Sequence, residues 1–409
     1  MEKEYPRWQI ERVRKALKTR RVVILSGARQ VGKTTLSTQI SSEDCSYRSL
    51  DDLGLLAAAL EDPKGFVKNP SGTMVIDEIQ KAPSLLPAIK QAVDKNNRPG
   101  QYLLTGSANL QTLPGVSESL AGRVRNIRLR PLAVGEILGR RPSFLERAFA
   151  ADFPIKIPGY DKEAMVELAF RGGYPEAVRL SDGQDRKEWH KDYLNSLLER
   201  DLKDLTHIRR QASLRELVSI LASWSAQFMD FTALCASLSV SKATVESYMN
   251  ALISLYLFER VPPWLRTDYE RIGRRPKFYA TDTGLMASIL GWRAKEVYLN
   301  SDRSGKLAET FVFQELSAQI ELEETYALAQ YRDREKREVD FIVEREDGSL
   351  LGIEVKSAQS VSKGDFRHME WFKSNLVKKP FKGLVLYNGE DTLSFGKDML
   401  AVPMASLWE

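Results

Sequence analysis

The feature that most constrains this chain is a glycine-containing segment that directly follows a short apolar run. Residues 27–34 read Gly-Ala-Arg-Gln-Val-Gly-Lys-Thr and match the pattern GxxxxGK(S/T). Val22 to Leu25 before it have the composition of a buried strand, and a helical pattern begins at Thr34. A loop in this context wraps a phosphate group with inward-facing N–H groups at a helix N-terminus. The sequence therefore predicts a phosphate-binding loop in an α/β fold.

Each residue of this loop has an expected role toward a bound nucleotide. The ammonium of Lys33 is expected to reach the β and γ phosphates, and the hydroxyl of Thr34 to bind Mg²⁺. The expected nucleotide contacts are Gly27, Ala28, Arg29, Gln30, Val31, Gly32, Lys33, Thr34 and Thr35. ATP and Mg²⁺ are therefore the predicted cofactors.

A second apolar run ends in two carboxylates. Thr73 to Ile76 is followed directly by Asp77 and Glu78. After a phosphate-binding loop, Asp77 is expected to hold Mg²⁺ through its water shell, and Glu78 to orient or deprotonate the attacking water. In isolation the same pair also fits a solvated loop, but the upstream loop favours the catalytic interpretation.

A third apolar run, Tyr102 to Leu104, ends in hydroxyl side chains. We predict that Ser107 senses the γ-phosphate or the attacking water. Thr105 and Asn109 are alternatives for this role, and an ordinary Ser/Thr turn is the structural alternative.

Phosphoryl transfer also needs a cation on the transferring group, often an arginine from a neighbouring subunit. Arg123, after the third run, is the first candidate, and Arg171 is the second. For both, a surface or structural ion pair is an equally good interpretation. An arginine supplied in trans would require a homo-oligomer.

The pattern along the chain predicts more than one domain. Short apolar runs alternate with helical patterns, which favours a parallel sheet with crossover helices. A length of 409 residues exceeds what one core usually organises. Helix-breaking residues gather between Gly139 and Asp161. We predict a nucleotide-binding domain over 1–150, a helical lid and winged-helix module over 151–295, and an α/β domain over 296–409.

Composition excludes several classes of protein. The chain is 43% hydrophobic and 28% charged, with a net charge of +5, as expected for a folded protein rather than a disordered one. Cys45 and Cys235 belong to no metal-binding pattern and favour a reducing compartment. No run approaches the roughly 18 to 20 apolar residues that span a bilayer, and the first residues lack an apolar signal core. A cytoplasmic protein that does not enter a membrane is expected.

The segment 230–248 predicts a helix, a tight turn and a second helix from about 241 to 255. Asp230 and Ser239 or Ser241 are the expected caps. Strands near 258–261 and 276–280 would add a wing. Residues 259–277 hold six Lys or Arg and three Asp or Glu, a local excess of three positive charges that suits contacts with DNA phosphates. A module that only packs against protein is the alternative.

A second candidate site lies near the C-terminus. A helix carrying Glu309 precedes a strand with Asp340 and a return strand with Glu354 and Lys356. A three-residue loop with Gly348 as its left-handed bulge would place Asp340 opposite Glu354, and the chemistry predicts that turn. Asp340 and Glu354 would then share a Mg²⁺, Lys356 would activate water, and Glu309 would complete a phosphodiesterase site. A charge-paired hairpin, or DNA binding without cleavage, is the alternative.

Taken in order, the motifs GARQVGKTTL, VIDEIQ, LLTGSAN, SLAGRV, RGGYPEA, EVDFIV and IEVKS make the chain similar to the prokaryotic AAA-type ATPases whose C-terminal half is a domain of unknown function. The resemblance implies a RecA/AAA-like P-loop domain, a winged-helix middle and a C-terminal fold like that of restriction-endonuclease-type nucleases. It also implies that Lys33, Thr34, Asp77 and Glu78 carry the nucleotide chemistry. Asp340, Glu354 and Lys356 match the nuclease triad.

Two functions follow from these patterns. The first is a Mg²⁺-ATP-driven motor or switch that acts on DNA, including branched DNA, with a nuclease-like domain that grips or cuts it. The second is a nucleotide-dependent regulatory or scaffold switch that binds protein partners and carries an inactive nuclease-like domain.

Overall fold

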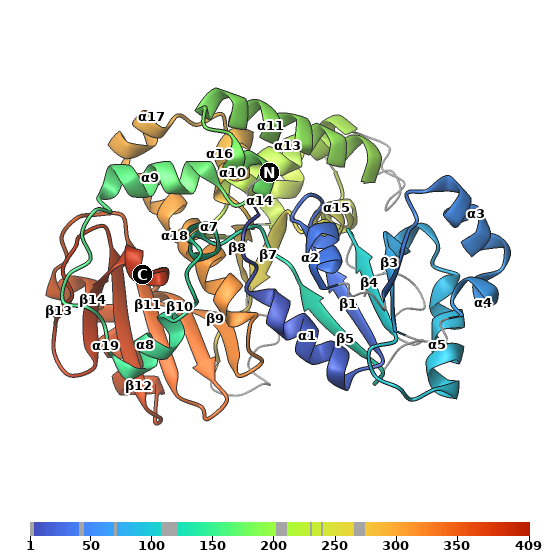
Figure 1. Ribbon diagram of the computed structural model, residues 1–409. Coiled ribbons are helices and arrows are strands. Elements are labelled where there is room, and N and C mark those ends of the chain that lie inside the picture. The colour runs from blue at the N-terminus through green and yellow to red at the C-terminus, as the bar shows by residue number, and fades with distance from the viewer. Residues whose placement is uncertain are drawn as a thin grey trace. The chain divides into compact units, whose positions relative to one another are not determined.

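The computed structural model describes residues 4–40, 45–68, 72–107, 122–201, 211–229, 231–238, 240–265 and 275–409 (Figure 1). The chain divides into two compact units. The first comprises Met1–Pro131 with Ser254–Tyr256, and the second comprises Leu132–Ile253 with Leu257–Glu409. The phosphate-binding loop belongs to the first unit. Apart from Ser254–Tyr256, the predicted middle and C-terminal segments belong to the second.

A parallel sheet forms the centre of the first unit. Among the described residues its strands, in spatial order, are β2 (Cys45–Ser49), β3 (Thr73–Asp77), β4 (Tyr102–Gly106), β1 (Val22–Ser26) and β5 (Val124–Arg128). The three apolar runs of the sequence are β1, β3 and β4, which confirms the predicted parallel sheet. The edge strands β2 and β5 were not predicted.

Helices cover both faces of this sheet. The helices α3 (Leu53–Glu61), α4 (Pro63–Phe66) and α5 (Leu85–Lys95) contribute to a core with one set of alternating strand residues (Figure 1). That core includes Val22, Ile24, Met74, Ile76, Tyr102 and Leu104 from the strands, and Leu86, Ile89 and Val93 from α5. The helices α1 (Gln9–Thr19) and α2 (Lys33–Ile40) contact β1, β4 and β5 on the other side. Strand alternation therefore produces two apolar faces, as a sheet buried on both sides requires.

The second unit begins with a helical region. Its described helices are α7 (Val134–Leu138), α8 (Phe144–Ala150), α9 (Lys162–Arg171), α10 (Pro175–Arg179), α11 (Gly183–Ser196), the π-helical η3 (Leu197–Asp201), α13 (Gln211–Ser223), α14 (Phe231–Leu238), α15 (Lys242–Ser254), α16 (Thr283–Ile289) and α17 (Ala294–Leu299). The predicted helix pair is α14 and α15. The Oγ of Ser241 accepts a hydrogen bond from the N–H of Thr244 and caps α15. Asp230 and Ser239, the other expected caps, lie outside the described residues.

A small antiparallel sheet accompanies this helix pair. It has the order β6 (Gln227–Phe228), β8 (Lys277–Ala280) and β7 (Phe258–Val261). Strands β7 and β8 are the two strands expected after the helix pair, and they do pair with each other. Residues 266–274, which hold much of the predicted positive charge, lie outside the described residues.

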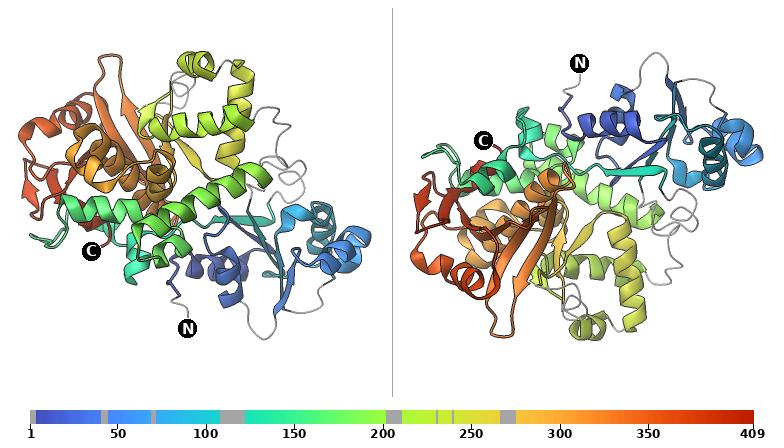
Figure 2. Two further views of the ribbon diagram at one scale, coloured as in Figure 1. Left: turned by 90° about the horizontal axis from the view of Figure 1, so that it is seen from above. Right: turned by 90° about the horizontal axis from the view of Figure 1, so that it is seen from below.

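The C-terminal part of the second unit is built on a larger mixed sheet. Its described strands have the order β13 (Leu393–Ser394), β14 (Met399–Pro403), β12 (Phe381–Tyr387), β11 (Leu350–Lys356), β10 (Glu338–Arg345) and β9 (Tyr326–Arg332). Helix α18 (Ser301–Ile320) and helix α19 (Arg367–Leu376) lie on opposite sides of this sheet (Figure 2). Successive residues of β10 point to these two sides. The ring of Phe341 contacts Tyr279 of β8, which stacks on Phe313 of α18, whereas Ile342 belongs to a hydrophobic cluster that includes residues of α19.

The turn between β10 and β11 has the predicted bulge. Phe341 is opposite Ile353 and Glu344 is opposite Leu350, so the same register places Asp340 opposite Glu354. Gly348 has φ +79° and donates its N–H to the carbonyl of Arg345 at 2.7 Å. The predicted register is therefore confirmed.

Several contacts join earlier parts of the second unit to its C-terminal segment. The N–H of Trp264, after β7, donates to the carbonyl of Gln330 in β9 at 2.6 Å. Buried Ser225 and Thr310 share a hydroxyl hydrogen bond of 2.8 Å. On α18, both carboxylate oxygens of fully buried Glu315 accept from the N–H of Val134, at 3.2 and 3.1 Å.

The longest described helix of the second unit, α18, has 20 residues and carries charges along its length. Across the described part of the chain, no helix combines the length and the apolarity needed to cross a membrane.

The buried carboxyl of Glu315 predicts a pH dependence of stability. Burial raises its pKa from 4.5 to about 8. The folded protein therefore binds more protons at this group than the unfolded chain between these values, and its contribution to stability falls as pH rises. In Glu315→Gln this contribution to the pH dependence should disappear. The free energy of unfolding of the variant should therefore rise relative to that of the wild type by up to about 1.4 kcal/mol for each pH unit between these values. Chemical unfolding at about pH 5.5 and about pH 7.5 measures this.

The control is Glu163→Gln, on the exposed first turn of α9. It should leave the pH trend of the wild type unchanged. Equal pH trends in Glu315→Gln and the wild type would contradict the assignment.

Candidate functional sites

The phosphate-binding loop connects β1 to α2 and needs glycine at two places. Gly27 has φ +153°, and a Cβ there would lie 2.2 Å from the carbonyl oxygen of Leu129. Gly32 has φ +95°. Both conformations belong to the region that L-residues with a Cβ rarely adopt. The pattern of glycines is therefore explained by the path of the backbone.

Two cations fix this loop. Lys33 is 5% exposed, and its ammonium donates to the carbonyls of Gly27 at 3.0 Å and Ala28 at 2.7 Å. The guanidinium of buried Arg7 donates to the carbonyls of Val31 at 2.5 Å and Arg130 at 2.6 Å. Arg7 was not predicted, because one arginine before an amphipathic helix carries no recognisable pattern.

Asp77 is the centre of the neighbouring hydrogen-bond network. It is 4% exposed at the carboxyl end of β3. Its Oδ2 accepts from the hydroxyls of Thr34 at 2.9 Å and Tyr47 at 2.6 Å, and its Oδ1 accepts from the hydroxyl of Thr105. Burial, together with the bond to Asp77, raises the pKa of Tyr47 above its usual value. The structure thus brings together Thr34 and Asp77, as predicted from the sequence, and adds Tyr47, which was not predicted.

Glu78 and Ser107 form a second group beside Asp77. Glu78 has a left-handed backbone with φ +58°. Its Oε2 accepts from the amide of Gln80, and that amide also donates to the Oγ of Ser107 at 3.0 Å. The hydroxyl of Ser107 lies 3.4 Å from Oε2 of Glu78. The hydroxyl of Thr105 donates to Asp77 and accepts from the N–H of Glu78 at 3.3 Å, so it contacts the backbone of Glu78, whereas Ser107 contacts its carboxylate. Asn109 lies outside the described residues.

These residues fit a magnesium nucleotide. The backbone at Gly27 leaves no room for a side chain, as a loop that approaches phosphate closely requires. The hydroxyl of Thr34 and the carboxylate of Asp77 are oxygen ligands, the kind that Mg²⁺ prefers.

The two arginine candidates lie elsewhere. Arg123 precedes β5, and because β5 is parallel to β1 it lies at the amino edge of the sheet, next to Val22. The loop leaves β1 at the opposite edge, a strand length of about 17 Å away. Arg123 pairs with Asp94 at 2.5 Å and is not placed to reach the nucleotide of its own chain. Arg171, the last residue of α9, lies in the second unit near Glu315.

Replacing Gly27 by alanine should displace the loop. The new Cβ would overlap the carbonyl of Leu129, so we expect a loss of nucleotide affinity of at least about tenfold and destabilisation of about 2 kcal/mol or more. Calorimetric titration with Mg-ATP and chemical unfolding measure the two effects.

The matched control is Gly122→Ala, where φ is +76° but no heavy atom lies within 4 Å of the new Cβ. This variant should keep the nucleotide affinity of the wild type, and its free energy of unfolding should be lower by about 1 kcal/mol. Wild-type affinity in Gly27→Ala would show that the close approach is not required.

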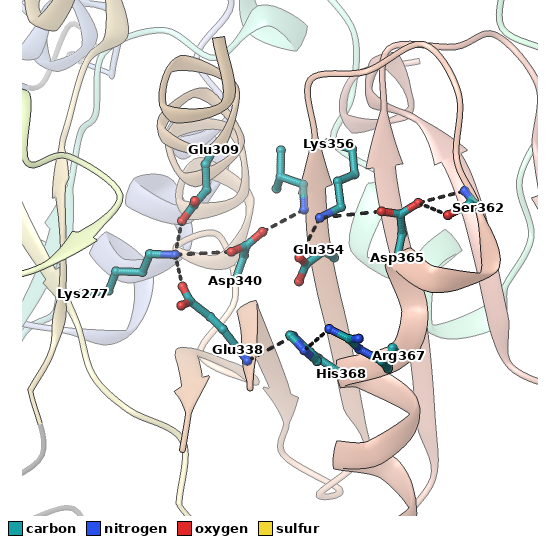
Figure 3. A network of polar contacts seen from close by, with 11 residues as sticks. Lys277, Glu309, Glu338, Asp340, Glu354, Lys356, Ser362, Asp365, Arg367 and His368 are labelled. Atoms are coloured by element: carbon teal, nitrogen blue, oxygen red, sulfur yellow. Dashed lines mark hydrogen bonds and ion pairs between the residues drawn. The ribbon is translucent and has the colours of Figure 1, made fainter. Parts of the chain in front are cut away.

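The second site is an acidic pocket, defined here as Glu309 of α18, Glu338 and Asp340 of β10, and Glu354 of β11 (Figure 3). The ammonium of Lys277, from β8, lies among the first three. It is 2.6 Å from Glu309, 2.6 Å from Glu338 and 3.3 Å from Asp340. The Lys277 side chain is 2% exposed.

Two members of the predicted triad, Lys356 and Glu354, pair with each other, whereas Asp340 has other partners. The Oδ2 of Asp340 accepts from the N–H of Val355 at 2.9 Å, and its Oδ1 faces Lys277. Lys356 donates to Oε1 of Glu354 at 3.0 Å and lies 3.9 Å from Asp365 (Figure 3). From the sequence, Lys277 is only one of the positive charges of residues 259–277, and no pattern predicts its contacts with Glu309, Glu338 and Asp340.

The pKa values in this pocket reflect burial opposed by charge pairing. Burial lowers the pKa of Lys277, but the carboxylates around it, Glu309 first, raise it well above its usual value. Burial raises the pKa of Glu309 to about 8, with a further rise from Asp340. Burial and then Asp340 also hold the pKa of Glu354 well above its usual value.

The pocket does not fit the predicted Mg²⁺ ion. Within the described ranges, no group of three or more His, Cys, Asp or Glu is arranged to hold a metal. The cation among these carboxylates is Lys277, whose ammonium donates to Oδ1 of Asp340 at 3.3 Å. The metal-ligand role expected of Asp340 therefore competes with its contact to Lys277. Glu354 pairs through Oε1 with Lys356, and its buried Oε2 has no hydrogen-bond partner among the described residues.

Three family models match successive parts of the chain. Residues 19–138 match an AAA domain, residues 162–296 match a domain of unknown function (DUF8612), and residues 304–407 match another (DUF4143). The AAA match includes the phosphate-binding loop and Asp77.

Relatives match most of the length of this chain. Uncharacterized protein Rv2008c of Mycobacterium tuberculosis and Uncharacterized protein Mb2031c of Mycobacterium bovis are each 30% identical over 397 residues, which is 96% of this chain and 82% of theirs. Uncharacterized protein MJ1544 of Methanocaldococcus jannaschii is 22% identical over 352 residues, covering 81% of this chain and 74% of its own.

Solved structures give more distant similarities. A RuvB variant from Thermotoga maritima has a TM-score of 0.30 at 20% identity, covering 63% of this chain and 90% of its own. AMPPCP-bound DnaA from Aquifex aeolicus has a TM-score of 0.29 at 15% identity, and the match covers 60% of this chain and 85% of the DnaA chain. These scores are too low to support a conclusion about this chain.

Proposed function

We propose that this chain, which belongs to the same family as the two mycobacterial relatives and matches an AAA domain over residues 19–138, is a Mg²⁺-dependent ATPase that acts on DNA. The observation that carries this proposal is the joining of the phosphate-binding loop to Asp77 through the hydroxyl of Thr34. A glycine loop, a lysine, a hydroxyl and a strand-end carboxylate are the parts that phosphoryl transfer needs at one edge of a sheet.

The roles of the individual residues follow from this arrangement. Thr34 and Asp77 would hold the magnesium ion, which neutralises phosphate charge when bound. Lys33 would exchange its carbonyl partners for phosphate oxygens. Glu78 would orient the attacking water, and its bonds to Gln80 and Ser107 set the direction of its carboxylate. Ser107 is our candidate for sensing the γ-phosphate.

The DNA component of the proposal rests on the second unit. The order α14, α15, β7 and β8 supports the proposal of a winged-helix module, in which two strands follow a helix pair. On α15, Lys242 is 71% exposed but lies 3.8 Å from Glu246, and Asn250 accepts from Arg260 at 3.2 Å. Because these side chains already have partners, we infer contacts to the DNA backbone rather than base-specific contacts.

We further propose that the active form is an oligomer. Arg123 lies at the sheet edge away from its own loop, so it would act only at the nucleotide of a neighbouring subunit.

Lys33→Ala should abolish ATP turnover, because it removes the cation that the loop offers to phosphate. In the wild type, turnover should rise with DNA, and steady-state assays with linear, single-stranded and four-way DNA would rank the forms. The matched control is Lys81→Ala, since Lys81 is an exposed lysine paired with Asp51 outside the loop. Turnover that is the same with every DNA form would refute action on DNA, and turnover in Lys33→Ala would refute the site.

A second function, a nucleotide-dependent scaffold that binds protein, is favoured by one observation. Three of the four carboxylates of the acidic pocket pair with Lys277, which suits a structural role better than metal-dependent cleavage. In this case the C-terminal sheet would organise partners without cutting DNA.

A nicking assay separates cleavage from both non-cutting roles. We expect supercoiled plasmid to stay intact with Mg²⁺ or Mn²⁺, at the background level of Asp340→Ala and Lys356→Ala. Nicking by the wild type that both variants abolish would instead assign a nuclease, provided that ATP turnover persists in the variants. Nicking that persists in both variants would come from a contaminant.

A further inference from the structure

The carboxylates of the acidic pocket need a positive charge close by. Four carboxylates from α18, β10 and β11 gather in a largely buried region, where the side chains of Glu309 and Asp340 are 15% and 11% exposed. Buried carboxylates need a cation close by, because their separation from water is otherwise too unfavourable. In a pocket of this kind the cation is either a metal ion or a basic side chain.

The ammonium of Lys277 is the cation that contacts three of these four carboxylates. An ammonium has three N–H donors, and three carboxylates surround this one at hydrogen-bond distance. The hydroxyl of Tyr279, two residues along β8, also donates to Glu309 at 2.6 Å. Both side chains therefore enter the pocket from the same strand, and both bind the same carboxylate.

A divalent ion and this ammonium would compete for the same oxygens. Mg²⁺ binds oxygen at about 2.0–2.1 Å and requires near-octahedral space. The oxygens facing such an ion would be those of Glu309, Glu338 and Asp340 that already contact Lys277. A second cation a few ångströms from the ammonium would also be repelled strongly in a region of low dielectric constant.

We propose that Lys277 is the resident cation of the acidic pocket, taking the place of a divalent metal ion and tying the β6–β8–β7 sheet to the C-terminal sheet. Lys277 is paired in register with Phe228 of β6 and Val261 of β7, so the tie holds all three strands. This inference does not rest on the ATPase proposal, because the pocket and the nucleotide residues belong to different compact units.

The first test measures metal binding by the unaltered pocket. Mn²⁺ is titrated into full-length wild type and Asp340→Asn without nucleotide, and bound Mn²⁺ is counted by electron paramagnetic resonance. Any binding at Asp77 is common to both proteins and cancels. We expect equal binding by the two. An additional Mn²⁺ in the wild type that Asp340→Asn loses would overturn the proposal, whatever the ATPase assays show.

The second test removes the resident cation. Lys277→Met should lower the Tm by at least about 5 °C and gain a Mn²⁺ site that is at least tenfold tighter than in the wild type. Adding Asp340→Asn should abolish that site. The control is Lys306→Met, which removes an α18 lysine bonded to the carbonyl of Ser223 and should gain no Mn²⁺. A folded Lys277→Met that keeps the wild-type Tm and gains no Mn²⁺ would contradict the proposal.

If Lys277→Met does not fold without metal, its refolding with and without Mn²⁺ becomes the measurement. Recovery of the far-ultraviolet circular dichroism of the wild type with Mn²⁺ supports the proposal. Recovery by Lys277→Met/Asp340→Asn without metal also supports it, because that variant has less uncompensated charge. Failure of both would show that Lys277 is needed for reasons other than charge in the pocket.

Discussion

The carboxylate of Asp77 is the point on which the nucleotide-binding edge of the first unit depends. It lies at the end of β3, and β4 separates that strand from β1 and its loop. A contact between the loop and Asp77 must therefore cross β4. Three hydroxyl groups donate to Asp77 from the neighbouring segments. Thr34 comes from the loop side, Thr105 from β4 between them, and Tyr47 from β2 at the edge. One carboxylate thus sets the distance between loop and acidic strand, and this explains why the strand between them ends in hydroxyl residues.

The residues of this network that follow buried strands could be predicted from the sequence, whereas the others could not. Strands β1, β3 and β4 are apolar runs and were predicted. Strand β2 reads Cys-Ser-Tyr-Arg-Ser and is only half-buried, as an edge strand is, so no apolar run reveals it. Tyr47 was missed with the strand that carries it. Arg7 was missed for another reason, because its partners are backbone carbonyls of residues distant in the chain, and no side-chain pattern records them.

In the second unit the local geometry was predictable and the long-range contact was not. The position of Gly348 and the need to bring two acidic residues together were enough to predict the bulged turn and its register. Lys277 is 63 residues before Asp340 and stands in a segment whose positive charge favoured DNA contacts. Its burial depends on how β8 packs against α18 and β10. Only tertiary structure shows that this one charge is internal, which changes the meaning of the acidic motif.

The different surroundings of Lys33 and Lys277 explain why one ammonium suits a ligand and the other does not. Both are buried. Lys33 donates to neutral carbonyls, so its positive charge is not cancelled and can attract a phosphate group. Lys277 donates to carboxylates, so its charge is compensated within the protein. A lysine in a motif is therefore informative about function only when the charge of its partners is known. By that criterion the loop at 27–34 is built to bind an anion, whereas Glu309, Glu338 and Asp340 of the acidic pocket already have a cation of the protein as their partner.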